Sequence, residues 1–303
     1  MNKMTNSEFQ SLILSEGIKN VILDTDAYNE IDDQFCIAYM VKRPDKINLL
    51  SINAAPFFNS NSTGAEDGME KSYDEILKLQ ALMGSDVPTY RGSRAFLKDR
   101  NTPEDSDACD NIINTVMNTD ERVIIVAIGA ITNVASAILK CPEIVDRAGV
   151  IWLGGHGHHL PSYPGKAVEF NLRGDIAAAQ IVFDSKIPLL QVPCGGVCSE
   201  ISTTTPELEH YLRGKGAICD YLVDNVAAIT FGKYAKSRVI WDVTTATPLI
   251  DPQGCMMAEV PAPIILDDGT YAFASTRHPI LYVQQLYRDR IFADLFRSLT
   301  GER

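Results

Sequence analysis

Short apolar segments rich in β-branched residues alternate along the chain with stretches of helical periodicity. The apolar segments, which predict strands, are residues 21–24, 47–55, 122–129, 149–155, 187–193 and 238–242. The amphipathic stretches, which predict helices, are residues 31–41, 69–84, 133–140, 175–183 and 220–235. Strands that are apolar throughout are typical of a parallel sheet covered by helices on both faces. The pattern therefore predicts an α/β fold with an open, mostly parallel, doubly wound sheet, whose ligands bind at the carboxyl edge.

The C-terminal region adds a different pattern. Residues 261–275, PAPIILDDGTYAFAS, predict a β-hairpin around a two-residue Asp-Gly turn, appended to the sheet. No repeat, low-complexity tract or linker interrupts the chain. We therefore expect residues 1–303 to form a single domain.

Composition and charge limit the kinds of binding partner and the cellular compartment that are expected for this protein. The net charge of −12 argues against a nucleic-acid polymer or an anionic membrane as partner, because both select basic surfaces. The chain contains no apolar run of membrane-spanning length and no secretory signal at its N-terminus. The seven scattered cysteines are typical of free thiols in a reducing compartment. These features predict a soluble cytoplasmic protein that binds a small molecule.

Acidic residues are concentrated directly after the first predicted strand, in VILDTDAYNEIDDQF (residues 21–35). They are Asp24, Asp26, Glu30, Asp32 and Asp33. The next helix is expected to begin near Asn29, with Asn29 as its N-cap, and a helix N-terminus favours acidic residues in its first turn. That arrangement accounts for Glu30. It does not account for Asp26 and Asp33 together, because one lies on the strand-end loop and the other on the helix.

Asp26 and Asp33 can face the same cleft, where carbonyl groups from neighbouring strand ends would also lie. A set of oxygen ligands of this kind is what a hard cation such as Ca²⁺ or Mg²⁺ prefers. The segment is not an EF-hand loop, so further ligands must come from distant parts of the chain. Asp242, at the end of the predicted strand 238–242, is a candidate.

Four motifs, in order, resemble those of the inosine-uridine nucleoside hydrolase family. DTDAYNEIDD is similar to its N-terminal motif DTDPGxDD, and GAITN, within residues 124–144, to its GPLTN segment. The third motif is WLGGHGHH (residues 152–159) followed by VEFNLRGDIAAAQIVF (residues 168–183). The fourth is VIWDVTTATPLIDP (residues 239–252). The resemblance covers residues 20 to 300. It implies the nucleoside hydrolase fold, which is Rossmann-like, and a Ca²⁺-dependent N-glycosidase that hydrolyses ribonucleosides to ribose and a free base.

The resemblance also implies roles for individual residues. Asp26 matches the general base, which touches the metal and activates a water held there. The further metal ligands would be Asp33, Asp242 and the backbone carbonyl of Ile128. The residues that would hold the ribose are Asp32, Glu169 and Asn171, while Asp24 and Asp175 fit as supporting acids. Relatives of this kind are commonly homodimers or homotetramers, which is the assembly expected here.

Three departures from the family pattern fall in the expected pocket. Five residues, AYNEI, separate DTD from DD where the family has three, so Tyr28 or Asn29 can move over the sugar. The family's histidine before the last aspartate is Trp241, which either stacks on the base or packs in the core. A ribose-facing asparagine is replaced by Tyr163, and Asn29 can substitute for it.

The histidine change removes the group often assigned to protonating the leaving base. His156 and His158, which lie with His159 in a glycine-rich loop, are the possible replacements. Zinc binding by these three histidines is a weaker alternative, because no further Cys or His is placed to complete the site.

Two other interpretations remain open from sequence. A haloacid-dehalogenase-like phosphatase would use Asp24 as nucleophile, Asp26 as acid and Mg²⁺, but it leaves Asp32 and Asp33 unused. A family member could also bind metal and sugar while acting on another ribosyl compound, or without turnover. Phosphate release from sugar phosphates would distinguish the first, and binding without ribose release the second.

Overall fold

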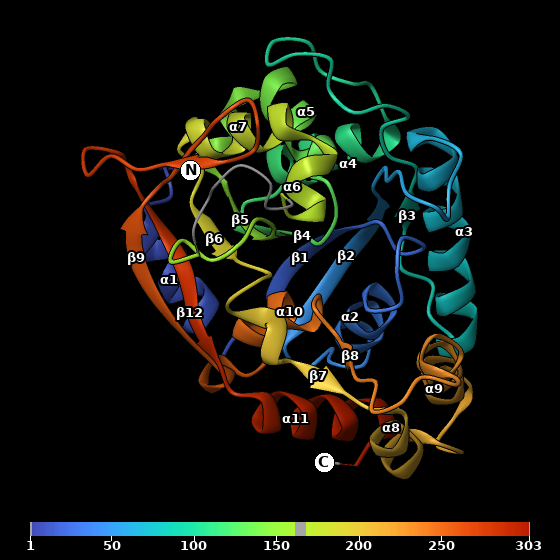
Figure 1. The fold of residues 1–303 in the computed structure, drawn as a ribbon. Coiled ribbons are helices and arrows are strands. Elements are labelled where there is room, and N and C mark those ends of the chain that lie inside the picture. The colour runs from blue at the N-terminus through green and yellow to red at the C-terminus, as the bar shows by residue number, and fades with distance from the viewer. Residues whose placement is uncertain (1, 161–167, 303) are drawn as a thin grey trace.

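The computed structural model describes residues 2–160 and 168–302. Its centre is an eight-stranded sheet in the order β3-β2-β1-β4-β5-β6-β12-β9, in which neighbours are parallel except for β12 and β9 (Figure 1). Its strands are β1 (Lys19–Thr25), β2 (Ile47–Ala54), β3 (Thr89–Tyr90), β4 (Val123–Ala127), β5 (Ala148–Leu153), β6 (Leu189–Val192), β9 (Cys255–Pro261) and β12 (Pro279–Leu286).

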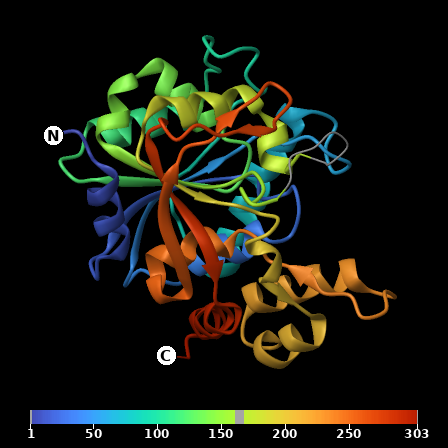
Figure 2. The same ribbon diagram turned by 60° about the vertical axis from the view of Figure 1, so that its left-hand side comes forward.

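Helices cover both faces of this sheet, so that the sheet lies between two helical layers (Figure 2). One layer contains α1 (Asn6–Leu14), α2 (Asp33–Val41), α3 (Ala65–Met83), α8 (Thr205–Leu212), α9 (Ala217–Thr230), α10 (Val243–Ile250) and α11 (Arg288–Thr300). The other contains α4 (Asp107–Met117), α5 (Thr132–Lys140), α6 (Phe170–Gly174) and α7 (Ile176–Ser185). The predicted doubly wound, mostly parallel sheet is confirmed.

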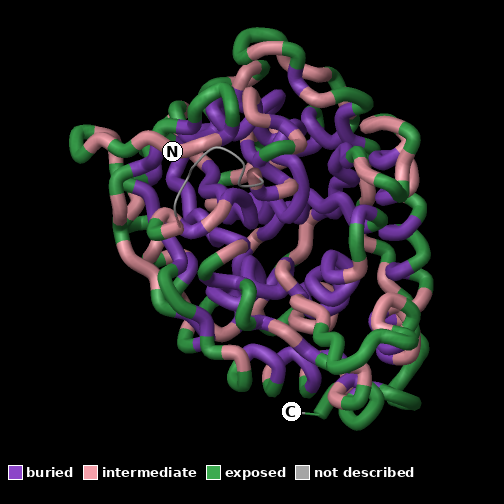
Figure 3. The backbone as a smooth tube through the Cα atoms, in the orientation of Figure 1, coloured by how far each residue is buried: buried purple, intermediate pink, exposed green. Residues whose placement is uncertain are grey.

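The apolar strands are explained by these two layers. In β1, Val21 and Leu23 pack into one hydrophobic core, and Ile22 between them packs into the other. Successive side chains of a strand point to opposite faces, so a strand buried on both faces must be apolar at every position. The central strands are accordingly buried along their length (Figure 3). Within the described residues, no helix has both the length and the apolarity that a membrane crossing requires.

The C-terminal strands differ from their prediction. Of residues 238–242, only Arg238–Val239 form a strand, β8, and it pairs with β7 (Ser202–Thr203) in a separate two-stranded sheet. The predicted hairpin exists as β10 (Ile264–Ile265) and β11 (Tyr271–Ala272), but it also stands apart from the main sheet. The edge of the main sheet is instead made by β12 and β9, whose partly exposed residues do not give a fully apolar pattern.

The prediction that Asn29 caps the first helix after β1 is wrong. Helix α2 begins at Asp33, and Asp32 is its N-cap. The Asn29 backbone N–H instead donates to the Asp26 carbonyl at 2.7 Å, which closes a turn. The Asn29 side-chain oxygen accepts a hydrogen bond from Asn59 at 2.5 Å, so it is not available to cap a helix. The longer loop thus ends in a turn that projects Asn29 away from the helix.

Candidate active site

A cavity of about 550 Å³ opens at the carboxyl edge of the sheet. Its walls come from the loops that follow β1, β2, β4, β5 and β6, together with α6 and the residues just before α10. This is where the loops of an open α/β sheet converge on a ligand. Every sequence-predicted site residue except Asp26 and His158 lines it.

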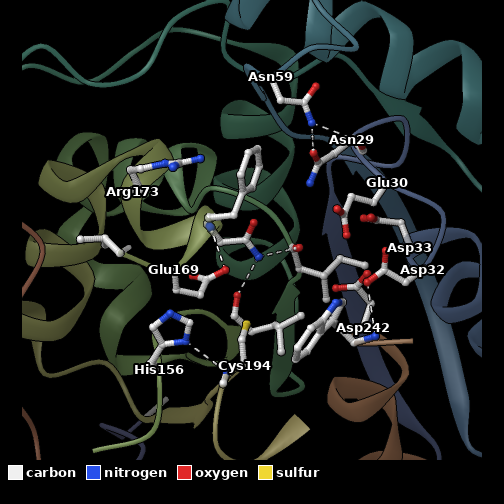
Figure 4. A pocket seen from close by; sticks show the side chains of 17 residues that line it. Asn29, Glu30, Asp32, Asp33, Asn59, His156, Glu169, Arg173, Cys194 and Asp242 are labelled. Atoms are coloured by element: carbon white, nitrogen blue, oxygen red, sulfur yellow. Dashed lines mark hydrogen bonds between the residues drawn. The ribbon is translucent and has the colours of Figure 1, made fainter. Parts of the chain in front are cut away.

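Three aspartates meet on one side of this cavity (Figure 4). Asp32, Asp33 and Asp242 are buried, and one carboxylate oxygen of each lies within 4.8 Å of the others. Asp32 is the N-cap of α2 and Asp33 its first residue, while Asp242 is the N-cap of α10. Two helix N-termini therefore bring carboxylates from distant parts of the sequence to one point. We refer to these three residues as the aspartate trio.

Asp26 interacts electrostatically with Asp33 and Asp32 of the aspartate trio but does not line the cavity. Its side chain is buried, and neither carboxylate oxygen has a hydrogen-bond partner among the described residues. The backbone of Gly129 closes against it, since a Cβ at position 129 would lie 2.9 Å from the Asp26 Cγ. Only glycine fits at this position. The sequence grouped Asp26 with Asp33 and Asp242, whereas the acids whose oxygens lie within 4.8 Å of one another in the structure are Asp33, Asp242 and Asp32 in place of Asp26.

Burial and mutual repulsion raise the pKa values of these acids. Burial raises the pKa of Asp26 well above its usual range, and Asp33 and Asp32 raise it further. Burial and the neighbouring Asp32 raise the pKa of Asp33 to about 8. The pKa of Asp242 is raised in the same way, by burial first and then by Asp33. A divalent cation among these oxygens would offset both costs, so the residues present fit a hard metal ion.

Two of the three predicted ribose-binding residues, Glu169 and Asn171, line the cavity apart from the aspartate trio. The Glu169 carboxylate caps α6, accepting hydrogen bonds from the backbone N–H groups of Gly155, Asn171 and Leu172 at 2.8–2.9 Å. The Asn171 side chain donates to the carbonyls of Ile128 at 3.0 Å and Leu153 at 2.9 Å. Because a carbonyl has two lone pairs, the Ile128 oxygen retains one for another partner.

The inserted loop contributes Asn29 to the cavity. Its carbonyl and side-chain oxygens accept hydrogen bonds from Asn59 and Asn61, which leaves its own amide N–H₂ free to donate. Tyr28 is 44% exposed and is not part of the cavity wall. Of the two residues that the longer loop was expected to bring over the sugar, the structure brings Asn29. Tyr163, which stands where the family has a ribose-facing asparagine, lies outside the described residues.

Of the two histidines expected at the site, His156 lines the cavity and His158 does not. His156 lines the cavity, and its Nδ1 accepts a hydrogen bond from the Gly195 N–H at 3.2 Å. A neutral imidazole that accepts at Nδ1 carries its proton at Nε2. His158 is instead packed among Tyr271, Phe273 and Tyr282, with its Nε2 at 2.9 Å from the Gln191 side-chain oxygen. The structure does not bring His158 to the cavity.

Trp241 packs as one of its two expectations states, while its stacking on a base stays a prediction. It lines the cavity and also packs against the hydrophobic core. Its backbone N–H donates to the Asp32 carboxylate at 3.3 Å, which ties it to the aspartate trio.

Two important residues were not singled out from the sequence. Asn133, in the GAITN segment, donates to Asp24 at 2.8 Å and so supports the end of β1. Arg238, on β8, forms ion pairs with Glu30 and Asp32. The position of Arg238 four residues before Asp242 was the one feature of the sequence that could have pointed to its place at the site.

Asp175, which the resemblance gave as a supporting acid, has a structural role. It caps α7 and accepts hydrogen bonds from Leu97 and Thr132.

Comparison with known proteins identifies the family. The family model described as inosine-uridine preferring nucleoside hydrolase matches residues 21–279. The chain belongs to this family. It is 26% identical over 278 residues to the pyrimidine-specific ribonucleoside hydrolase RihB of Escherichia coli strain SE11, covering 83% of this chain and 84% of that protein.

Solved structures show the same fold. A plant nucleoside hydrolase, the PpNRh1 enzyme, superposes with a TM-score of 0.75 at 21% identity, covering 93% of this chain and 99% of that one. A purine-preferring ribonucleoside hydrolase from Gardnerella vaginalis gives 0.75 at 20% identity, covering 94% and 99%. This nucleoside hydrolase is therefore an enzyme of the N-glycosidase class, and the predicted family and fold are confirmed. The phosphatase alternative is set aside.

Proposed function

We propose that this nucleoside hydrolase cleaves the N-glycosidic bond of ribonucleosides with Ca²⁺ bound by Asp26, Asp33, Asp242 and the Ile128 carbonyl. The observation that carries this proposal is the pair of unpartnered, buried oxygens of Asp26 beside the aspartate trio. Buried polar atoms are nearly always hydrogen-bonded, so oxygens without partners indicate a ligand that supplies the missing interaction. A ligand set made only of oxygens favours Ca²⁺ or Mg²⁺ over softer metals.

An ion held by these residues would supply positive charge that keeps the carboxylates ionised and helps to orient the sugar. The protein groups are placed to complete the sugar site. Asp32 can accept a hydrogen bond from a sugar hydroxyl, and Glu169 and Asn171 line the same cavity. Asn29 offers an amide N–H₂ in place of the asparagine that the family has at the position of Tyr163. Trp241 offers a flat apolar surface to the base.

Asp26 is the proposed general base. It takes a proton from the water whose oxygen forms a bond to C1′, while the C1′–N bond breaks and its electron pair leaves with the base. Such reactions pass through a state with positive charge at C1′, as in glycoside hydrolysis. The carboxylates around the cavity are placed to stabilise that charge. Without a metal ion, burial and then Asp33 and Asp32 raise the pKa of Asp26, and a bound cation would lower it again and keep the carboxylate ionised.

His156 is the proposed hydrogen-bond donor to the leaving base, since its Nε2–H is the proton-bearing nitrogen at the cavity and can stabilise the negative charge that the departing base takes up. We expect His156→Ala to lower kcat/KM for inosine by roughly 10- to 100-fold, the loss of a hydrogen bond to a charged group. Hydrolysis of p-nitrophenyl riboside should change little, because nitrophenolate is stable without that hydrogen bond. Comparing the two substrates with one variant controls for misfolding. Equal losses for both would exclude His156 as the donor.

The function itself is tested by ribose release from inosine, uridine, cytidine and adenosine, assayed with Ca²⁺ and after chelation. We expect hydrolysis of at least one nucleoside, lost with the chelator and restored by Ca²⁺. Thermal stabilisation by Ca²⁺ and nucleoside without ribose release would favour the alternative of a binding protein or of another ribosyl substrate. Restoration by Mg²⁺ but not by Ca²⁺ would overturn the choice of metal.

Three broader expectations stay predictions. They are the single domain over residues 1–303, the cytoplasmic location and the homodimeric or homotetrameric assembly. The partner proposed for the site is a small nucleoside or related riboside.

A further inference from the structure

Arg238 bridges two acids at the edge of the active site. It lies on β8, and its Nη2 contacts the carboxylates of Glu30 and, at 3.1 Å, Asp32. The Arg238 side chain is 18% exposed and that of Asp32 is 5% exposed, so this pairing is largely withdrawn from water. Charge-assisted hydrogen bonds in such surroundings are stronger than those on an open surface. Glu30 belongs to the lengthened loop after β1, and the ion pair therefore joins that loop to the segment leading into Asp242.

The contacts of Asp32 differ from those of the other acids. One of its oxygens accepts from Arg238 and the other from the Trp241 N–H at 3.3 Å. Asp26, by contrast, has two oxygens without any partner among the described residues. Buried aspartates of the same site thus differ in the hydrogen-bond partners that the protein gives them. A carboxylate that is already paired with a guanidinium is a weaker ligand for a cation. Its remaining lone pairs can still accept a hydrogen bond from a hydroxyl group.

We propose that Arg238 is a positioning residue that withholds Asp32 from the metal ion and directs it to a hydroxyl group of the ribose. This inference rests on the proposed function, because it assigns a role within that same site. Glu30 anchors the guanidinium from the other side. One Asp32 oxygen already lies within 4.8 Å of oxygens of Asp33 and Asp242, so without Arg238 the carboxylate would be free to serve as a further ligand of the ion.

The geometry also predicts which substitution is tolerated. Both ion pairs use one nitrogen of Arg238, and its Nε is buried without a hydrogen-bond partner in the part of the chain that the structure describes. The guanidinium therefore acts as a point charge and not as a two-pronged fork. A lysine ammonium is a compact point charge with three donors, so it can replace that interaction.

The test compares Arg238→Gln and Arg238→Lys by kinetics and by Ca²⁺ titration. We expect Arg238→Gln to raise KM for inosine roughly tenfold, the loss of a charge-assisted contact, with a much smaller change in kcat. Calcium binding should stay as tight or become tighter, because a positive charge near the ion is removed. Arg238→Lys should restore most of the KM. Arg213→Gln is the matched control, since Arg213 Nη2 bridges Glu209 at 2.9 Å and Asp224 at 2.8 Å away from the cavity.

A double-mutant cycle separates positioning from general support. If Arg238 acts through Asp32, Arg238→Gln should add little to the KM of Asp32→Asn. Parallel losses of calcium affinity, KM and melting temperature would show a merely structural clamp and overturn the proposal, as would an unchanged KM in Arg238→Gln. If the wild-type enzyme binds inosine without releasing ribose, the proposed function fails, and the dissociation constant of inosine replaces KM in the same comparison. Absence of any nucleoside binding would overturn both.

Discussion

Asp26→Asn should lower kcat for ribonucleoside hydrolysis by roughly 10²–10⁴-fold, the usual contribution of a general base. The amide has the shape of the carboxylate but cannot accept the proton of the attacking water. It still offers one oxygen to the metal, and Asp33, Asp242 and the Ile128 carbonyl are unchanged, so Ca²⁺ should continue to bind. Steady-state kinetics with inosine, together with calorimetric titration of Ca²⁺, measures both quantities.

The metal-free form of this variant gives an independent check. Because burial and the neighbouring acids disfavour the charge on Asp26, its removal should leave the melting temperature unchanged or raise it. Asp120→Asn, at an exposed position, controls for the loss of one negative charge. Near-normal turnover in Asp26→Asn would exclude Asp26 as the base. Loss of calcium binding together with turnover would make it a metal ligand alone.

Asp33→Ala should abolish calcium binding and, with it, measurable hydrolysis. The change removes a buried carboxylate of the proposed ligand set, one oxygen of which lies within 4.8 Å of oxygens of Asp32 and Asp242. Binding of an ion to the native state raises stability in proportion to the logarithm of its concentration over its dissociation constant. The increase in melting temperature on adding Ca²⁺, expected for the wild type, should therefore disappear.

The metal-free proteins provide the control for this variant. In the absence of Ca²⁺, Asp33→Ala should melt close to the wild type or above it, because a repelled carboxylate has been removed and the loss of packing is small. A wild-type response to Ca²⁺ in Asp33→Ala would exclude Asp33 as a ligand. Unfolding without Ca²⁺ would show that the side chain supports the fold through Thr25, whose hydroxyl donates to it.

The central fold could be predicted because its signal is local. Strands such as β4 and β5 are apolar at every position, since both faces of the sheet are covered, and a short window of sequence contains that information. Strand β9 lies at the edge of the sheet and β12 next to it, and both carry exposed residues and so lack the same pattern. The separate pairing of β7 with β8 depends on contacts between residues far apart in the chain, which periodicity does not encode.

The site was predictable in part for a similar reason. Asp26 and Asp33 lie in one dense acidic segment, and motif order pointed to Asp242. The pairing of Arg238 with Glu30 and Asp32 joins segments more than 200 residues apart. The removal of His158 from the cavity depends on the packing of three aromatic rings, which no spacing within WLGGHGHH reveals. Long-range charge pairing and side-chain packing were the parts that sequence could not supply.

The carboxylates at the starts of α2 and α10 have a consequence for how firmly the ion is held. The backbone N–H groups at each of these helix ends carry partial positive charge, which stabilises the acids but also opposes the cation that they bind. The same backbone dipoles would thus lower the energetic cost of the buried carboxylates in the ion-free protein and weaken the binding of the proposed ion. With calcium as the proposed ion, its concentration as well as that of the nucleoside would then set the fraction of active enzyme.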